Sequence, residues 1–359
     1  MLALGFGIAV TAVVLGYLLF IRPGQHVHVE GSFQAGPYGG LEPHQTYHME
    51  HPNRPHRIPD MMRDRASIER SLRPFSYTTN NRGFRGRDIE MKKGEDVFRI
   101  GVVGECVAMG VGVKEDETWP AILEGLLNSL PRATARFEVL NISLGGVPPR
   151  QVVINLTEYT KEYELDLVLL APGSDTVLLP EHIGEPFSLD MGEENYAVIL
   201  SKYAELLRNA TAYCGRAKIP LVFITTTLNS FFLPDGYRWN ETMSTVAAEL
   251  NVPVFNTVEI VEREEQKNGL ILTSEEGNQK LVRLVNGVPE ILFSVPFVVG
   301  TDELHVSQKI YQFLEDNQDI RPRMTIDDNH LTPEGHGIVA QELLVFLDTN
   351  KLLSVRLNQ

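Results

Sequence analysis

Residues 99–113 read Arg-Ile-Gly-Val-Val-Gly-Glu-Cys-Val-Ala-Met-Gly-Val-Gly-Val. The apolar first half predicts a buried β-strand, and the glycines around its end predict a tight turn that leads into a helix. A side chain at such a turn is exposed at the strand end, where the N-terminus of the following helix favours a thiolate or an oxyanion. Cys106 occupies this position, so we expect a chemical site to be built around it.

Strand-like and helical patterns alternate along the chain from residue 97 onward. Repeated strand–helix–strand units favour a parallel sheet covered by helices on both faces, which is a three-layer α/β fold. Ligands in such folds bind at the carboxyl ends of the strands. The predicted strands are 97–103, 137–142, 165–171, 221–225 and 252–255, and the predicted helices are 119–130, 150–163, 196–217, 242–250 and 332–347.

Two further segments flank or interrupt this domain, which is expected to span residues 97–359. Residues 61–96 are rich in arginine and are interpreted as a lead-in segment that packs on the domain. Residues 269–323 depart from the alternating rhythm and are interpreted as an insertion, with extra strands near 281–285 and 291–299.

The N-terminal end of the chain predicts a membrane anchor. Residues 2–21 contain no charged side chain, and a run of this length spans a bilayer as a helix. The basic leader and small-residue cleavage site of a signal peptide are missing, so we expect residues 1–21 to be an uncleaved transmembrane anchor. Small residues recur in it at four-residue spacing, which permits another membrane helix to pack closely, although a lone anchor explains the run equally well.

Residues 22–60 are predicted to be a linker. They contain six prolines, five glycines and six of the ten histidines, with almost no apolar periodicity, and cannot form a core of their own. The histidines invite a metal-site interpretation, but no cysteine or carboxylate cluster accompanies them. Solvated linker histidines are the better interpretation, and neither a metal nor a cofactor is expected.

Composition excludes several classes of protein. The chain is 43% hydrophobic with a formal charge of −15, and the acidic excess lies after residue 100. This is the composition of a globular domain, and its acidity argues against a nucleic-acid partner. With Cys106 and Cys214 as the two cysteines, and no Cys-x-x-Cys pair, a disulfide scaffold and a zinc ribbon are excluded.

Four short segments fall where the predicted strands end or where the last helix begins. Together, in this order, they resemble the SGNH, or GDSL, hydrolase family, and the resemblance covers about residues 80–347. It implies a flavodoxin-like parallel sheet in a three-layer fold. The four segments are residues 104–112 (Gly-Glu-Cys-Val-Ala-Met-Gly-Val-Gly), 141–146 (Asn-Ile-Ser-Leu-Gly-Gly), 172–175 (Pro-Gly-Ser-Asp) and 327–330 (Asp-Asp-Asn-His).

The resemblance implies roles for five residues. Cys106 stands at the nucleophile of the family's Gly-Asp-Ser block, and Asp327 and His330 match its Asp-x-x-His block. The oxyanion hole would be formed by Cys106, Gly146 and Ser174, where Ser174 replaces the family's asparagine. In acyl transfer, an imidazole takes the proton of the nucleophile, a carboxylate fixes the imidazole tautomer, and donors stabilise the oxyanion.

Both the nucleophile and one oxyanion donor thus differ from the family pattern. A site shaped around a serine oxygen must accept the larger sulfur of Cys106, and a shift of about 1 Å in the reacting atoms costs on the order of a hundredfold in rate. Loss of one oxyanion donor costs about a further hundred- to thousandfold. Glu105 is expected to serve the hydrogen bonding of the turn, and its charge would oppose formation of a thiolate at Cys106. His336 is interpreted as a packing or capping residue, and Cys214 as a small core residue.

These departures favour a catalytically degenerate protein that serves as an accessory or structural subunit of a membrane assembly, with other membrane helices as partners. The alternative is an envelope esterase or O-acyltransferase that uses Cys106, His330 and Asp327 on an acylated glycan or lipid, a substrate class that the resemblance implies. The charges that flank the anchor determine orientation poorly. The resemblance places the globular domain on the periplasmic or extracellular side of the membrane.

Overall fold

The computed structural model describes most of the chain from residue 75 onward. Among the described residues, no helix is both long and apolar enough to cross a membrane. The predicted anchor, residues 1–21, lies outside them. The described residues are 41–49, 75–131, 133–145, 147–173, 192–227, 237–267, 269–275, 278–285, 288–296, 313, 317, 323–325 and 330–353.

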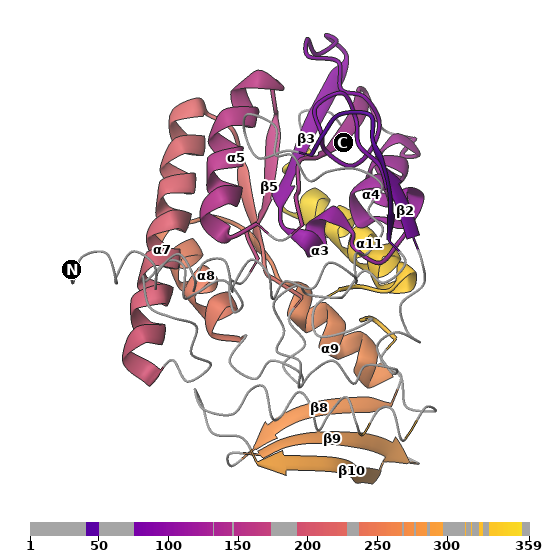
Figure 1. Ribbon diagram of the computed structural model, residues 1–359, viewed down its shortest axis with the longest axis vertical. Coiled ribbons are helices and arrows are strands. Elements are labelled where there is room, and N and C mark those ends of the chain that lie inside the picture. Colours follow the sequence, from indigo (N-terminus) through magenta and orange to yellow (C-terminus); the bar gives the residue numbers. More distant parts are fainter. Residues whose placement is uncertain are drawn as a thin grey trace, which may run out of the picture.

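A five-stranded parallel sheet forms the centre of the molecule (Figure 1). The strand order β4-β3-β5-β6-β7 is the order of flavodoxin-like folds, so the predicted sheet class is confirmed. Nearly every strand residue is buried because helices cover both faces of the sheet, and the strands are therefore mostly apolar. The strands are β3 (Val97–Gly104), β4 (Arg136–Asn141), β5 (Leu167–Ala171), β6 (Leu221–Ile224) and β7 (Val254–Phe255).

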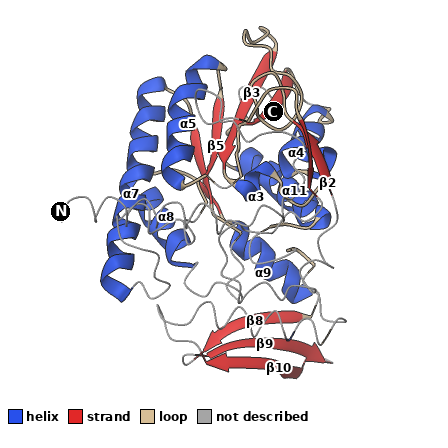
Figure 2. Ribbon diagram, viewed as in Figure 1, coloured by secondary structure: helices blue, strands red, loops and turns tan. Residues whose placement is uncertain are grey.

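Two groups of helices complete the three layers (Figure 2). One core contains Leu156, Leu207 and Met243 and lies between the sheet and α5, α7 and α8. The other contains Leu123 and Leu343 and lies between the opposite face and α4, α9 and α11. The helices are α4 (Trp119–Asn128), α5 (Pro149–Glu162), α7 (Gly192–Ala217), α8 (Tyr237–Leu250), α9 (Thr257–Lys267) and α11 (Pro333–Thr349).

The two largest differences between the helices and the sequence prediction concern α8 and α9. Helix α8 begins five residues before its predicted start, because Trp239 joins Met243, Val246 and Ala247 on the buried face. Helix α9 was not predicted. Its apolar stripe is narrow, and Glu264 and Glu265 are buried on it, so the sequence reads as polar.

The segment predicted as an insertion contains a separate antiparallel sheet, visible at the bottom of Figure 1 beside α9. Its strands are β8 (Leu270–Glu275), β9 (Asn278–Val285) and β10 (Val288–Pro296), in the order β10-β9-β8. Strand β8 was not predicted. It follows α9 almost directly in the chain, and the Leu284 N–H of β9 donates a hydrogen bond to the Gly269 carbonyl, just before β8, at 2.9 Å.

Part of the predicted linker pairs with the lead-in segment. Strand β1 (Thr46–Met49) is antiparallel to β2 (Phe75–Thr78), and the pair forms a two-stranded sheet. Tyr47 stacks on Tyr77 at a centroid distance of 5.2 Å, and both rings pack with Met109. The chain before β3 therefore contacts the turn that carries Cys106.

Candidate functional site

The site begins at the turn after β3, which places Cys106 at the carboxyl end of the sheet. Gly104 ends the strand, Glu105 is the N-cap, and α3 (Cys106–Met109) is one helical turn. A Cβ on Gly104 would lie 2.5 Å from the Ala108 Cβ and 2.8 Å from the Ala171 carbonyl oxygen. This glycine therefore allows the close approach of α3 and β5 that the turn requires.

Glu105 contacts Cys106 directly through its side chain. The Cys106 thiol donates a hydrogen bond to the Glu105 Oε2, while Glu105 Oε1 accepts the Val107 N–H at 3.2 Å. The carboxyl group is buried, so its interactions are screened little by solvent. Glu105 thus caps the turn, as expected, and in addition binds the hydrogen of the candidate nucleophile.

His330 lies near Cys106 in space although it is far from Cys106 in the sequence. It lies just before α11 and is 7% exposed, and its imidazole is close enough to the Cys106 thiol to lower the pKa of that group. The loop that carries it is closed by an isolated bridge between Thr325 and Leu331 and by the Thr332 N–H, which donates to the Met324 carbonyl at 2.9 Å. The structure therefore brings Cys106 and His330 together.

The electrostatics of this group keep the thiol protonated. Burial, followed by the charge of Glu105, raises the pKa of Cys106 to about 12, although His330 acts in the opposite direction. Burial likewise raises the pKa of Glu105, against the hydrogen bond from Cys106 and the charge of His330. The helix N-terminus expected to favour a thiolate is a single turn, and it does not overcome these effects.

Three predicted site residues, Gly146, Ser174 and Asp327, lie outside the described residues. Their described neighbours still locate two of the blocks. The Gly145 N–H donates to the Met109 sulfur at 3.2 Å, and a Cβ on Gly145 would lie 3.7 Å from the Cys106 Cβ. These contacts place the segment after β4 beside α3.

The segment after β5 approaches Glu105. Gly173 has a φ of 75°, and a Cβ at this position would lie 2.2 Å from the Glu105 Cγ. Such a contact excludes any larger residue without movement of Glu105. The carboxyl ends of β3, β4 and β5 therefore meet around the Glu105–Cys106 turn.

His336 and Cys214 have the structural roles expected for them. His336 is 1% exposed, and its Nδ1 accepts the Trp119 N–H at 3.2 Å. Burial, with the charges of Arg85 and His330, lowers the pKa of His336 to about 3, so this imidazole is neutral at pH 7. Cys214 lies on α7 with its side chain in the core, where burial raises its thiol pKa to about 11.

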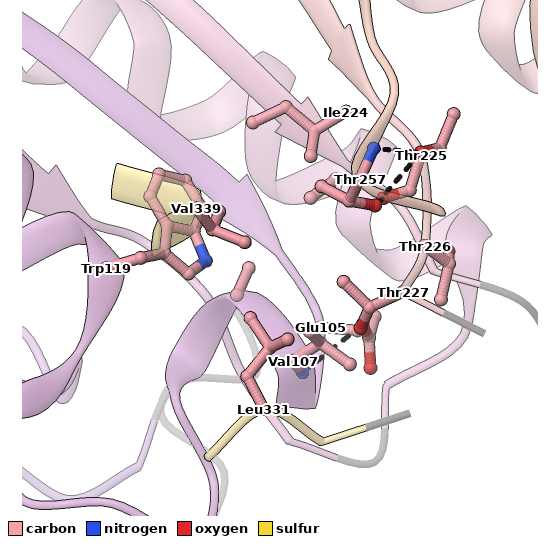
Figure 3. Close-up of a pocket in the computed structure, with 12 residues that line it drawn as sticks. Glu105, Val107, Trp119, Ile224, Thr225, Thr226, Thr227, Thr257, Leu331 and Val339 are labelled. Carbon is pink, nitrogen blue, oxygen red and sulfur yellow. Dashed lines mark hydrogen bonds between the residues drawn. The ribbon is translucent and has the colours of Figure 1, made fainter. Parts of the chain in front are cut away.

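A run of threonines at the end of β6 was missed by the sequence interpretation. Thr225, Thr226 and Thr227 line a cavity of about 20 Å³ together with Glu105 and Thr257 (Figure 3). The Thr225 and Thr257 hydroxyls lie 3.0 Å apart, and the cavity has room for one water molecule. Polar residues directly after the fourth strand were the available signal, because that position faces the same edge as Cys106.

Within the described part of the chain, no group of three or more histidine, cysteine or carboxylate side chains could hold a metal ion.

Tyr203 is a further residue near the site that the sequence did not indicate. It projects from α7 and stacks edge-on with Trp239, and burial, followed by the charge of Glu105, raises its pKa. The hydroxyl group therefore remains protonated beside the Glu105 carboxyl.

Comparison with known proteins gives only distant likenesses. No family model matches the chain, and no protein with a curated description matches it. Similar solved structures include a two-domain esterase active on acetylated mannans, a lipolytic protein of the G-D-S-L family from Veillonella parvula DSM 2008 and an acetyl xylan esterase, AlAXEase. Their identities to this chain are 16%, 10% and 13%, with TM-scores of 0.39, 0.37 and 0.37.

The matches cover 70%, 69% and 70% of this chain, and 49%, 97% and 100% of the three matched chains. The matched part therefore spans about half the length of the two-domain esterase. At these identities and TM-scores, the likeness assigns neither a family nor a function to this chain.

Proposed function

We propose that this chain is an SGNH-hydrolase-like protein whose catalytic centre is degenerate. The observation that carries this proposal is the hydrogen bond from the Cys106 thiol to Glu105, in a site where the thiol pKa is about 12. With a pKa raised this far, the thiol is held almost entirely in its protonated form at pH 7. A nucleophile held in this form attacks an ester slowly, because the thiolate is the reactive species.

The contact with Glu105 also opposes the usual role of the histidine as proton acceptor in such a site. In acyl transfer, the histidine accepts the proton of the nucleophile and later donates it to the leaving alcohol. Here the Glu105 carboxyl binds the thiol hydrogen beside His330, and its negative charge disfavours a second negative charge on the sulfur. Glu105 therefore competes with His330 at the first step.

We further propose that the protein is held in the membrane by residues 1–21 and acts as an accessory subunit, with its globular domain on the periplasmic or extracellular side. The uncharged run and its small residues at four-residue spacing support the anchor and a helix partner. Extraction from the native membrane in mild detergent, followed by sizing, tests this role. A free monomer would contradict it, and co-migration with other membrane proteins is expected.

A second candidate function is an envelope esterase or O-acyltransferase that uses Cys106, His330 and Asp327 on an acylated glycan or lipid. The proximity of His330 to the Cys106 thiol, whose pKa it lowers, favours it. In this case the Cys106 sulfur would form an acyl-enzyme with release of the alcohol. The amides of Cys106 and Gly146 and the side chain of Ser174 would bind the oxyanion.

Turnover of an activated short-chain acyl ester by the full-length protein distinguishes the two candidates. We expect the protein and its Cys106→Ala variant to be equally inactive. Turnover that the alanine variant abolishes would overturn the degenerate-centre proposal and establish a cysteine esterase. The double variant Glu105→Asp with Cys106→Ser restores the family's Gly-Asp-Ser block, and a gain of activity would show that the remaining parts of the site are sound.

A further inference from the structure

Arg85 is a buried cation directly beneath the turn that carries Cys106. It belongs to the segment before β3, and its side chain is fully buried. Its Nη1 donates to the carbonyl oxygens of Gly110 at 2.5 Å and Met109 at 3.3 Å, and its Nη2 donates to the Val113 carbonyl at 2.7 Å. One guanidinium group therefore binds three carbonyls of the segment that follows Cys106.

The remaining contacts of Arg85 fix the guanidinium in this place. Its Nε donates to the Glu115 carboxylate at 2.8 Å. The aromatic rings of Phe75 and Tyr77, both on β2, lie 5.7 and 5.2 Å from its central carbon. A cation between aromatic rings and a carboxylate is stabilised from both sides, so the donors toward the turn are held in one geometry.

The peptide of Gly110 connects Arg85 to Cys106. The Gly110 and Val111 N–H groups both donate to the Cys106 carbonyl at 3.1 Å, while the Gly110 carbonyl accepts from Arg85. Gly110 has a φ of 84°, and a Cβ there would lie 2.5 Å from Thr118. The left-handed residue that closes α3 is thus held to Cys106 on one side and to Arg85 on the other.

We propose that Arg85 is a positioning residue for Cys106, which keeps the α3 turn closed and the thiol buried against Glu105. The charges that act on the thiol are those of Glu105 and His330, so Arg85 acts through the position of the turn. The inference builds on the proposed role of Cys106. Its test measures thiol reactivity and does not depend on ester turnover.

The test is the pH profile of Cys106 alkylation by iodoacetamide in the full-length protein, in a Cys214→Ala background that leaves one cysteine. In Arg85→Met the turn is free to open, so the thiol gains solvent and its apparent pKa falls. We expect a fall of at least about one pH unit, which is about a tenfold rise in alkylation rate at pH 8. Arg85→Lys retains the cation with fewer hydrogen-bond donors, so the apparent pKa of the thiol in this variant should lie between the values in the unchanged protein and in Arg85→Met.

Arg99 provides the matched control. It is also a fully buried arginine, bound to the Glu138 carboxylate at 2.7 Å and to the carbonyls of Glu90, Met91 and Tyr163, but it lies near the start of β3, away from Cys106. Arg99→Met should lower stability and leave the Cys106 profile unchanged. An equal shift in both methionine variants would overturn the proposal, because general loosening would then explain the effect.

A milder variant protects the test against loss of folding. Glu115→Gln keeps Arg85 in place and weakens the pair that orients its Nε. It should shift the alkylation profile in the same direction as Arg85→Met, by a smaller amount. If Arg85→Met does not fold, an unshifted profile in both Glu115→Gln and Arg85→Lys overturns the proposal.

Discussion

The Cys106 thiol donates its hydrogen to the side chain of the residue that precedes it, Glu105. Adjacent residues at a turn usually point apart, but Glu105 folds back over the N-terminus of α3 and its Oε1 caps the Val107 N–H. The same carboxyl group thus stabilises the turn and suppresses ionisation of the nucleophile. Structural and chemical roles are combined in one side chain.

Replacing Glu105 by glutamine should release part of this suppression. Glu105→Gln keeps the length of the side chain and removes its negative charge, which is one cause of the raised thiol pKa. We expect the Cys106 pKa to fall by about one unit or more from about 12, measured by thiolate absorbance in a Cys214→Ala background. Asp116→Asn, at an exposed position on η2 (Glu115–Glu117), is the matched control and should have no effect.

His336 should make the protein sensitive to acid. Its pKa is about 3 in the folded protein, against an ordinary value of 6.5 for a solvated histidine, so the unfolded chain binds the additional proton. The stability contributed by the neutral imidazole is complete above about pH 6.5 and is lost as the pH falls toward 3. The loss amounts to several kcal/mol at the acid end of this window.

His336→Asn tests this expectation, because the asparagine oxygen can accept the Trp119 N–H in place of Nδ1. The variant should lose less stability between pH 7 and pH 4 than the unchanged protein, measured from urea denaturation at both pH values. Parallel pH dependence in the two proteins would show that this histidine does not carry the effect.

Gly104 and Gly125 should respond in opposite directions to alanine. In Gly104→Ala the new methyl group meets Ala108 and the Ala171 carbonyl, and the overpacking should cost about 1 to 3 kcal/mol. In Gly125→Ala, within α4, the methyl group meets nothing within 4 Å and should stabilise the helix by about 0.5 to 1 kcal/mol. Thermal unfolding measures the stability change in each variant, and an equal change in both would contradict the close approach of other atoms to Gly104.

Glu265 connects α9 to the loop that carries His330. Its Oε1 accepts the Met324 N–H at 2.6 Å, and the residue is 1% exposed. Glu265→Gln retains an acceptor and should cost little, whereas Glu265→Ala leaves a buried N–H unpaired and should cost about 1 to 3 kcal/mol. Denaturant midpoints report the difference, and an equal cost in both variants would argue that packing, not this hydrogen bond, holds the loop.

The alternation of apolar strands and amphipathic helices was sufficient to predict the three-layer fold and its parallel sheet. The reason is local: a strand buried on both faces must be mostly apolar, so β3 and β5 are recognisable without their neighbours. The turn at Cys106 was also predictable, because Gly104 and Gly110 mark it in the sequence. Helix α9 was not, since the buried Glu265 accepts its hydrogen bond from a residue distant in sequence, Met324.

Tertiary structure alone decided the chemistry of the site. The sequence placed Glu105 next to Cys106, but the contact between them requires burial and the close approach of Gly173, which lies on another strand end. Arg85 likewise reads as one of several arginines in a polar segment, and its function as a clamp depends on carbonyls from a turn that folds onto it. A pKa or a hydrogen bond is set by what surrounds a group in space, whereas the pattern of apolar residues along the chain determines only which elements form.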